Sequence, residues 1–314
     1  MPVFFIKFDD MKKENLYSIN SICELHSFLN LEKPAHPLVS VINLSDVRYN
    51  IPENTSSIVY NFYTVYLKKN YNAKIRYGQQ YYDFDSGVMA FFAPKQLFAV
   101  ESESSTKGEG WMLAFHPDFI QGYQVAKRMK EYGFFSYAVN EALHTSQKEE
   151  DIISGVMQNL QNEIDKTIDH FTQDVIISHI ELLLNYCNRF YSRQFITRKK
   201  ANNEILSKLE SLLNDYFDNS EAEKSGIPSV QYFAEQLNIS PSYLSDMLRS
   251  LTGQNTQQHI HEKLIERAKE LLSTTTLSVA EIAYQLGFEH PQSFHKLFKG
   301  KTNLSPLKFR QSLN

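Results

Sequence analysis

The chain has 314 residues, 42% of them hydrophobic and 22% charged, so it can form packed cores and is not expected to be disordered. This length predicts two domains. The two cysteines, Cys23 and Cys187, are far apart and have no C-x-x-C partner, which argues against a disulfide framework and a zinc site. The apolar run Val3–Ile6 is too short for a secretory signal, and no stretch is apolar enough for a membrane span. We therefore expect a cytoplasmic protein without membrane contact.

The net charge of −4 is unevenly distributed. From Arg198 onward the chain carries 14 basic and 13 acidic residues, a net charge of +1, so the preceding part carries −5. No acidic residue follows Glu289, whereas several basic ones do. These are Lys296, Lys299, Lys301, Lys308 and Arg310. A basic C-terminal end suits an anionic partner such as DNA, although a solvated charged tail would have the same composition.

Residues from about 36 to 116 are predicted to form strands, because short β-branched and aromatic runs alternate there with Gly, Pro, Asn and Asp turns. The runs are Leu38–Leu44, Ser57–Tyr66, Ile75–Phe84, Val88–Phe92 and Met112–Phe115. Closely spaced short strands predict a β-barrel or sandwich.

An aromatic cluster within these strands is a candidate effector pocket. Tyr77, Tyr81, Tyr82 and Trp111, with Arg76 nearby, have the side chains needed to stack on a sugar or to bind an anionic metabolite. The same residues at strand spacing would equally form core contacts and cross-strand pairs.

Helical periodicity replaces the strand pattern from about residue 117 to 191. Asp118–Tyr132 is predicted as a helix, and Ser146 with Glu149 forms a capping box for the next one. In the segment 172–190, an apolar stripe recurs at alternating spacings of four and three residues. Its members include Ile176, Ile180, Leu183 and Cys187. This helix either packs on the strand domain or also contacts its copy in a homodimer.

A polar, basic break at Ser192–Asn203 separates this half from a helical C-terminal half. We predict an N-terminal effector or dimerisation domain at 1–195, a linker at 196–203 and a second domain at 204–314. A polar loop at Asp218–Ser229 interrupts the helices of the second domain.

The C-terminal half contains one motif twice, at Phe233–Arg249 and Ile282–Lys299. Each copy has a small alanine in its first helix, a residue that tolerates left-handed backbone at the turn, and a proline at the start of its second helix. The residues concerned are Ala234, Asn238 and Pro241 in the first copy, and Ala283, Gly287 and Pro291 in the second. This pattern predicts two helix-turn-helix units.

The second helix of each unit is predicted to face DNA with its polar side. Six side chains are expected to read bases: Ser242, Ser245, Asp246, Gln292, His295 and Lys296. Three others suit phosphates: Arg249, Lys299 and Lys301. Leu251 and Leu297 are expected to point inward with the other apolar residues. Thr256–Ser273 is predicted as one linker helix, and entry into successive major grooves requires a separation of about 34 Å.

These motifs resemble the C-terminal domain of the AraC/XylS family of transcription regulators. The resemblance rests on Leu264–Leu272, on Ile282–Lys299 and on Ser305-Pro306 with Phe309-Arg310, and covers about a third of the chain. It implies a seven-helix domain with two helix-turn-helix units that recruits or positions RNA polymerase at a promoter. The N-terminal half is then similar to the cupin-like domains of many members. Asp246 departs from the family pattern, where a basic residue is usual.

We therefore expect an α+β protein that is a sequence-specific transcription regulator, an activator, whose N-terminal domain senses a small molecule, dimerises, or does both. One alternative is a regulator without a ligand. Another is an enzyme fused to a DNA-binding module, but neither cysteine lies in a Pro-Cys-His-Arg-like context. The histidines show no H-x-H spacing, although His36 and His116 could meet in the fold. We expect no catalytic residue, metal or cofactor.

Overall fold

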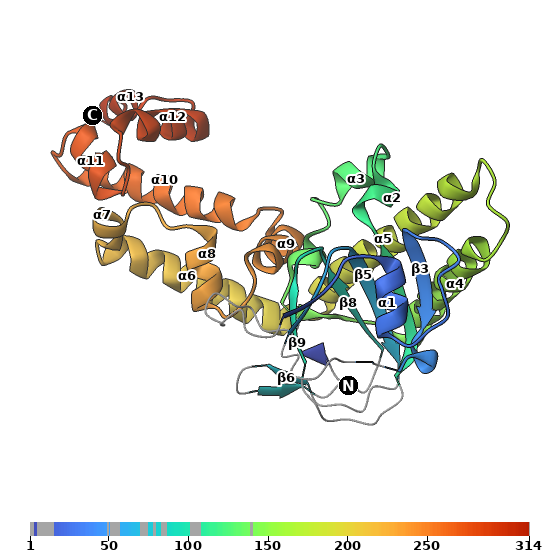
Figure 1. The fold of residues 1–314 in the computed structure, drawn as a ribbon. Helices are drawn as coiled ribbons and strands as arrows, with labels where there is room; N and C mark the ends of the chain where they lie inside the picture. The colour runs from blue at the N-terminus through green and yellow to red at the C-terminus, as the bar shows by residue number, and fades with distance from the viewer. Residues whose placement is uncertain are drawn as a thin grey trace. The chain divides into compact units, whose positions relative to one another are not determined.

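The computed structural model describes residues 3–4, 16–48, 50, 57–69, 75–77, 80–82, 87–100, 108–138 and 141–313 (Figure 1). The chain folds into two compact units, residues 1–194 and 195–314. The first combines β-sheets with helices, and the second is helical. Within the described part of the chain, no helix has the length and apolar character needed to cross a bilayer.

The described strands of the N-terminal unit form two main sheets and a hairpin. The four-stranded sheet has the order β1 (Val3–Phe4), β9 (Leu97–Val100), β4 (Ser57–Tyr60), β2 (Leu16–Ile19). The five-stranded sheet has the order β11 (Leu143–His144), β8 (Val88–Phe92), β5 (Tyr63–Lys69), β10 (Glu109–Phe115), β3 (Val39–Asn43). The hairpin pairs β6 (Ile75–Tyr77) with β7 (Gln80–Tyr82). β2 and β4 run parallel, and the other pairs are antiparallel.

One core fills the space between the two main sheets. Ile19 and Ile58 reach it from the four-stranded sheet, and Ile42, Phe92 and Met112 reach it from the five-stranded sheet. Helix α1 (Ile22–Phe28) closes this core with its apolar side. The predicted β-sandwich followed by helices is therefore confirmed, as is the α+β class.

Two long helices belong to this unit, α4 (Gln147–Ile164) and α5 (Thr172–Thr197). The predicted capping box of α4 is present, with the Ser146 backbone N–H donating to Glu149 Oε2 at 2.8 Å. Helix α4 contacts β3, β5 and β10, and α5 reaches β8 through Cys187 (Figure 1). Met89 and Phe92 point to opposite faces of β8, so α5 packs on the face of the five-stranded sheet that is turned away from the core between the sheets.

Several predicted boundaries in this unit are wrong. The run 57–66 is divided between β4 and β5, which lie in different sheets, and the run 75–84 contains the β6–β7 hairpin. The helix predicted over 118–132 is broken into α2 (Pro117–Ile120) and α3 (Gln124–Arg128), because Gly122 has φ 89° between them. Strands β2 and β9 and helix α1 were not predicted. Two short 3₁₀ helices complete the unit, η1 (Leu44–Asp46) and η2 (Gly133–Ser136).

The polar stretch 192–203 is not a break. Helix α5 continues to Thr197, and the next helix begins at Lys199. The Arg193 guanidinium makes two bonds to Glu149, at 2.7 and 3.1 Å, and donates to the His144 carbonyl at 2.7 Å. Gln194 Oε1 accepts the His144 N–H at 2.8 Å. These polar side chains anchor a helix, which is why their composition was a poor guide to a linker.

The C-terminal unit consists of eight helices within the described residues. They are α6 (Lys199–Asp218), α7 (Glu221–Ser225), α8 (Val230–Gln236), α9 (Pro241–Thr252), α10 (Thr256–Thr274), α11 (Val279–Gln285), α12 (Pro291–Thr302) and α13 (Pro306–Gln311). The loop predicted at 218–229 thus contains a short helix, α7. The two predicted helix-turn-helix units are the pairs α8–α9 and α11–α12, joined by α10.

Candidate nucleic-acid interface

The turns of the two helix-turn-helix units have the backbone that the sequence predicts. Asn238 and Gly287 have φ 54° and 86°, the left-handed conformation. Helix α9 then begins at Pro241, and the Ser240 hydroxyl accepts the Tyr243 N–H at 3.2 Å. Helix α12 begins at Pro291 without a side-chain cap.

Helix α9, the second helix of the first unit, is deeply embedded. Four of its side chains are buried: Tyr243, Leu244, Met247 and Leu248. On its outer side, Arg249 Nη1 lies 2.7 Å from Asp246 Oδ1, and these side chains are 56% and 27% exposed. The ion pair cancels the charge of the one basic residue on α9. The outer face of this helix therefore offers DNA no net positive charge.

Ser245, predicted to read bases, is half-buried, as are Ser242 and Asp246. Its hydroxyl lies 3.0 Å from the hydroxyl of Thr256, which is completely buried at the start of α10. Leu251, predicted to point inward, is only half-buried. Exposed Ser250 was not predicted as a contact residue. The buried side of α9 thus also includes Tyr243 and Met247.

Helix α12 is far more exposed than α9. Only Phe294 and Phe298 are buried among its residues, and Leu297 is half-buried. The predicted contact residues Gln292, His295, Lys296, Lys299 and Lys301 are all exposed. Ser293 is also exposed. It was not predicted, because it lies on the same side of the helix as Leu297, which was expected to point inward.

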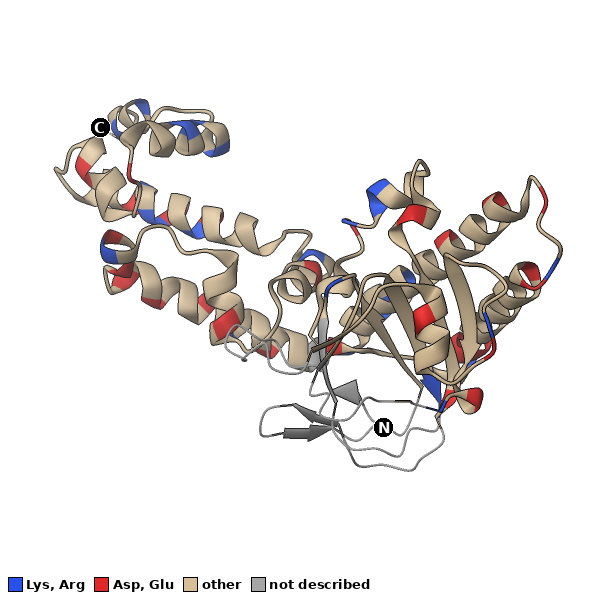
Figure 2. Ribbon diagram, viewed as in Figure 1, with Lys and Arg blue, Asp and Glu red and all other residues tan. Residues whose placement is uncertain are grey.

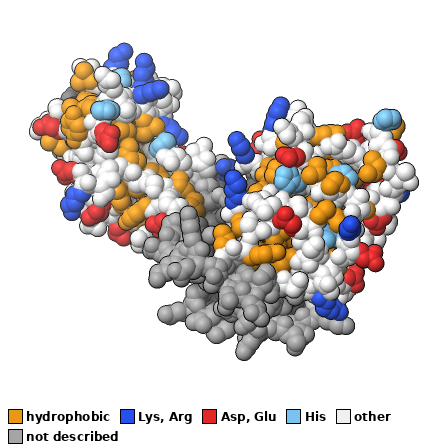
Figure 3. Space-filling view, in the orientation of Figure 1, with side chains coloured by type: hydrophobic (Ala, Val, Ile, Leu, Met, Phe, Trp, Pro, Cys, Tyr) orange, Lys and Arg blue, Asp and Glu red, His pale blue; other side chains and the backbone are white. Residues whose placement is uncertain are grey.

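The charge difference between the two helices extends over the unit. Basic side chains gather over α12 and α13, whereas the part of α6 from Glu204 to Asp218 carries four acidic residues and one lysine (Figure 2). In the space-filling view the basic side chains stand at the surface around α12 and α13 (Figure 3). One of the basic residues is structural, since Arg310 Nε donates to the Leu272 carbonyl at 3.0 Å and caps α10. The exposed basic side chains of this unit are therefore concentrated on α12 and α13.

Helix α10 connects the two helix-turn-helix units as one continuous helix. The predicted stripe Ile260, Leu264, Ala268, Leu271 and Leu272 is buried along it. A capping box begins the helix, with the Asn255 side chain accepting the Gln258 N–H at 3.0 Å. The linker helix is thus confirmed as one continuous element of 19 residues.

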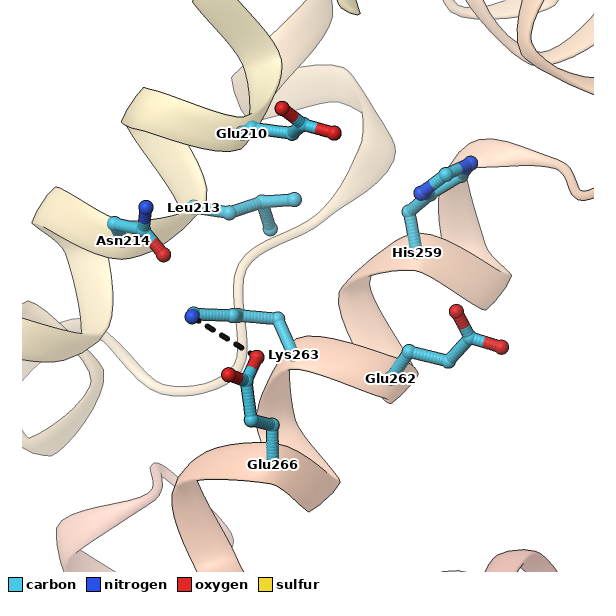
Figure 4. Close-up of a pocket in the computed structure, with 7 residues that line it drawn as sticks. All are labelled: Glu210, Leu213, Asn214, His259, Glu262, Lys263 and Glu266. Carbon is cyan, nitrogen blue, oxygen red and sulfur yellow. Dashed lines mark hydrogen bonds and ion pairs between the residues drawn. The ribbon is translucent and has the colours of Figure 1, made fainter. Parts of the chain in front are cut away.

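A groove of about 500 Å³ lies between α6 and α10 (Figure 4). Glu210, Glu262 and Glu266 line it, and Lys263 Nζ pairs with Glu266 Oε2 at 3.0 Å. Three carboxylates against one paired lysine repel phosphate. The groove is therefore no part of a DNA interface.

The predicted effector pocket falls largely outside the described side chains. For Arg76, Tyr77, Tyr81 and Tyr82 the structure describes only the β6–β7 backbone, in which Arg76 pairs with Tyr81. Trp111 lies on β10, in a different sheet, opposite Leu67 and Asn43. The pocket remains a prediction.

The prediction that the apolar stripe of α5 contacts a second copy does not agree with the burial of this stripe. Ile176, Ile180, Leu183 and Cys187 are completely buried within the single chain. Cys187 Sγ lies 4.0 Å from Met89 Sδ of β8, and burial raises the pKa of this thiol. These side chains are out of reach of a second copy. The stripe packs on the sheet, the other alternative that the sequence left open.

His36 and His116 each accept a hydrogen bond from a backbone N–H two residues further along the chain. His36 Nδ1 accepts the Leu38 N–H at 3.1 Å, and its ring packs edge-on against Phe119. His116 Nδ1 accepts the Asp118 N–H at 3.3 Å at the start of α2. Across the described ranges, no three His, Cys, Asp or Glu side chains gather as metal ligands would.

Residues 233–312, which hold both units and the linker helix, match the helix-turn-helix domain family. The C-terminal unit is an AraC-type DNA-binding domain.

Several curated proteins and solved structures match part of the chain. The Msm operon regulatory protein of Streptococcus mutans is 36% identical over 84 residues, which are 27% of this chain and 30% of that protein. The HTH-type transcriptional activator RhaS of Salmonella paratyphi B is 30% identical over 136 residues, 43% of this chain and 46% of that protein. The DNA-binding domain of AdpA, solved in complex with a target DNA, is 25% identical and covers 35% of this chain and 90% of its own, with a TM-score of 0.29. The chain spans less than half the length of the curated relatives it matches.

Proposed function

We propose that the protein is a sequence-specific transcription regulator, an activator, that places α9 and α12 in successive major grooves of DNA. The observation that carries this proposal is the repeat itself: two helix-turn-helix units, each with polar residues on the outer side of its second helix, are joined by one continuous linker helix. The names of the relatives, an operon regulator and a transcriptional activator, support regulation as the purpose of binding.

The two second helices are proposed to play unequal roles. Helix α12 supplies most of the affinity, because Lys299 and Lys301 reach phosphates without an acidic neighbour on the helix. Gln292 suits adenine and Lys296 suits guanine, while His295 lies exposed between them. Helix α9 contributes selectivity through Ser242 and through Asp246, which can accept from cytosine.

The N-terminal unit is proposed to control this binding by sensing a small molecule, by dimerising, or by both. Its sandwich of two sheets supports a sensing role, and resemblance to the AraC/XylS family supports contact with RNA polymerase. Thermal unfolding against a metabolite library distinguishes a sensor, which one class of metabolite stabilises, from a domain that only dimerises or contacts proteins. Stabilisation by no metabolite would favour the second role.

The test of DNA binding is selection of duplexes from a random pool by the full chain, followed by titration at several salt concentrations. We expect saturable binding with a preferred sequence that weakens steeply with salt. Lys299→Ala should weaken binding, whereas Lys208→Ala on α6 is the matched control and should not. Equal binding of all duplexes, or equal loss in both variants, would contradict the proposal.

A further inference from the structure

The loop predicted between α6 and α8 contains α7, which contacts α11 of the second helix-turn-helix unit. We infer that α7 and the contact between Gly226 and Gly287 act as a brace that fixes the orientation of the second unit against the first. The protein would then accept DNA sites of only one spacing. This inference deepens the proposed function and rests on it.

At Gly287 the second unit meets backbone atoms of residues 222–227. A Cβ placed on Gly287 would lie 2.6 Å from the carbonyl carbon of Gly226, 2.7 Å from the Ala222 oxygen and 2.8 Å from the Ile227 nitrogen. Real Cβ atoms essentially never come so close to other atoms, and backbone atoms cannot swing aside as a side chain does. The turn of the second unit is thus pressed directly against residues 222–227.

The other end of the brace is fixed to the first unit. The Gly226 carbonyl accepts a hydrogen bond from the Tyr216 hydroxyl of α6 at 3.0 Å. The ring of Tyr216 packs edge-on against Tyr232 and Phe233 of α8, with centroids 5.2 and 6.3 Å apart. Phe233 is completely buried in the core of that unit. A continuous path of contacts therefore runs from the first unit through Tyr216 and Gly226 to the turn of the second.

The first unit provides an internal control for the role of Gly287. Asn238 and Gly287 occupy the same place in their units, and both have left-handed backbone. Asn238 is exposed, which shows that this turn accepts an asparagine where nothing covers it. At Gly287 the positive φ alone would permit Asn as well. Packing against α7, not the turn itself, therefore demands glycine there.

A second connection between the two helix-turn-helix units, besides α10, affects which DNA sites the protein can bind, because the grooves of DNA repeat at a fixed spacing. Helix α10 has 19 residues and spans about 28 Å, so units joined by it alone could still pivot at its two ends. One additional base pair between two contacted segments moves them apart by about 3.4 Å and rotates them by about 35°. A braced domain cannot follow that rotation, whereas an unbraced one can.

The first measurement needs no DNA. Nitroxide labels at Ser250→Cys on α9 and Gly300→Cys on α12 report the distance between the helices by pulsed electron resonance, in a Cys23→Ser background of the full chain. We expect a narrow distribution in the parent, a broader one with Gly287→Asn, and no change with Asn238→Gly. Tyr216→Phe, which keeps the ring packing and loses the bond to Gly226, should broaden it to a lesser extent. An unchanged distribution in both Gly287→Asn and Tyr216→Phe would overturn the brace.

The second measurement uses the duplex selected by the wild-type chain and the same duplex lengthened by one base pair between its two contacted segments. We expect the wild-type chain to lose affinity by about tenfold on the longer duplex and Gly287→Asn by less than about threefold. Equal losses would overturn the brace while leaving DNA binding intact. If the wild-type chain prefers no duplex, the proposed function fails, and the label distances still decide whether the brace exists.

Discussion

The net charge on the outer face of α9 is set by a single ion pair between Asp246 and Arg249. An exposed pair at this helical spacing adds only about 0.3–0.5 kcal/mol to stability. We expect a larger effect on DNA binding, because Asp246 would repel phosphate and already pairs with the guanidinium of Arg249.

We predict that Asp246→Asn raises the affinity of the full chain for unrelated duplexes by about three- to tenfold and steepens the salt dependence by about one counterion. Asp246→Arg should raise it further. The readout is titration of several sequences at a series of salt concentrations. Asp215→Asn on α6 removes the same charge elsewhere and should change little; an equal gain there would mean that only net charge matters.

The two cysteines should differ sharply in reactivity. Cys23 is exposed, whereas Cys187 is completely buried and its pKa is raised by that burial. Near pH 8 we expect a thiol reagent to modify one cysteine per native chain and both after denaturation. Since burial raises the folded pKa, the Cys187 contribution to stability is present below the unfolded pKa of about 8.5 and is lost as the pH rises above it. Rapid modification of both native thiols would contradict this packing.

At the scale of the element, α9 and α12 should respond differently to loss of a cation. Lys299→Ala is predicted to weaken binding of all duplexes similarly and to reduce the salt slope by about one, because a free phosphate contact is lost. Arg249→Ala should have a smaller effect, since Asp246 already holds that guanidinium. Both are measured in the same salt titrations. A larger effect of Arg249→Ala would show that the ion pair opens on DNA.

Helix α5 allows a second comparison between neighbouring residues. Ile180 is completely buried and Leu182 is 42% exposed. Ile180→Ala should lower the free energy of unfolding by about 2–5 kcal/mol, and Leu182→Ala should change it by less than about 0.5 kcal/mol. Urea denaturation gives both values. If light scattering shows a dimer, Ile180→Ala should affect folding and Leu182→Asp, on the accessible side, should test assembly. A dimer lost only with Ile180→Ala at full stability would restore the stripe as the interface.

The elements that the sequence predicted well are those specified by neighbouring residues. Caps, prolines at helix starts and turn residues lie within a few positions of each other, so both helix-turn-helix units and α10 were predictable. Helix α7 was missed because five residues contain no periodicity. The contact of Ser245 with Thr256 was not predictable either, because Thr256 belongs to the next helix. The helical course of 192–203 depends on Arg193 reaching Glu149, 44 residues away, which no local pattern reveals.

At the scale of the whole molecule, the domain boundary also depends on contacts between residues that are far apart in the sequence. Composition placed the start of the second domain at residue 204, after the polar stretch. The C-terminal unit begins at Phe195 instead, with the last turn of α5. The Phe195 ring packs edge-on against Tyr243 of α9 at 5.2 Å, and Asn202 Nδ2 donates to the Phe195 carbonyl at 2.7 Å. Residues that appeared to be a linker therefore support a helix proposed to face DNA.

This support leads to a prediction about isolated fragments. A fragment of residues 195–314 should fold and bind the selected duplex, whereas 204–314 lacks the side chain that covers Tyr243. We expect the shorter fragment to be less stable by about 1.5–3 kcal/mol, the contribution of one buried aromatic side chain, and to bind more weakly because α9 loses its support. Urea denaturation and DNA titration of the two fragments measure both effects. Phe195→Ala in the longer fragment is the matched control and should reproduce most of the loss. Equal stability of all three would mean that the second unit begins at α6 and that the last turn of α5 contributes nothing to it.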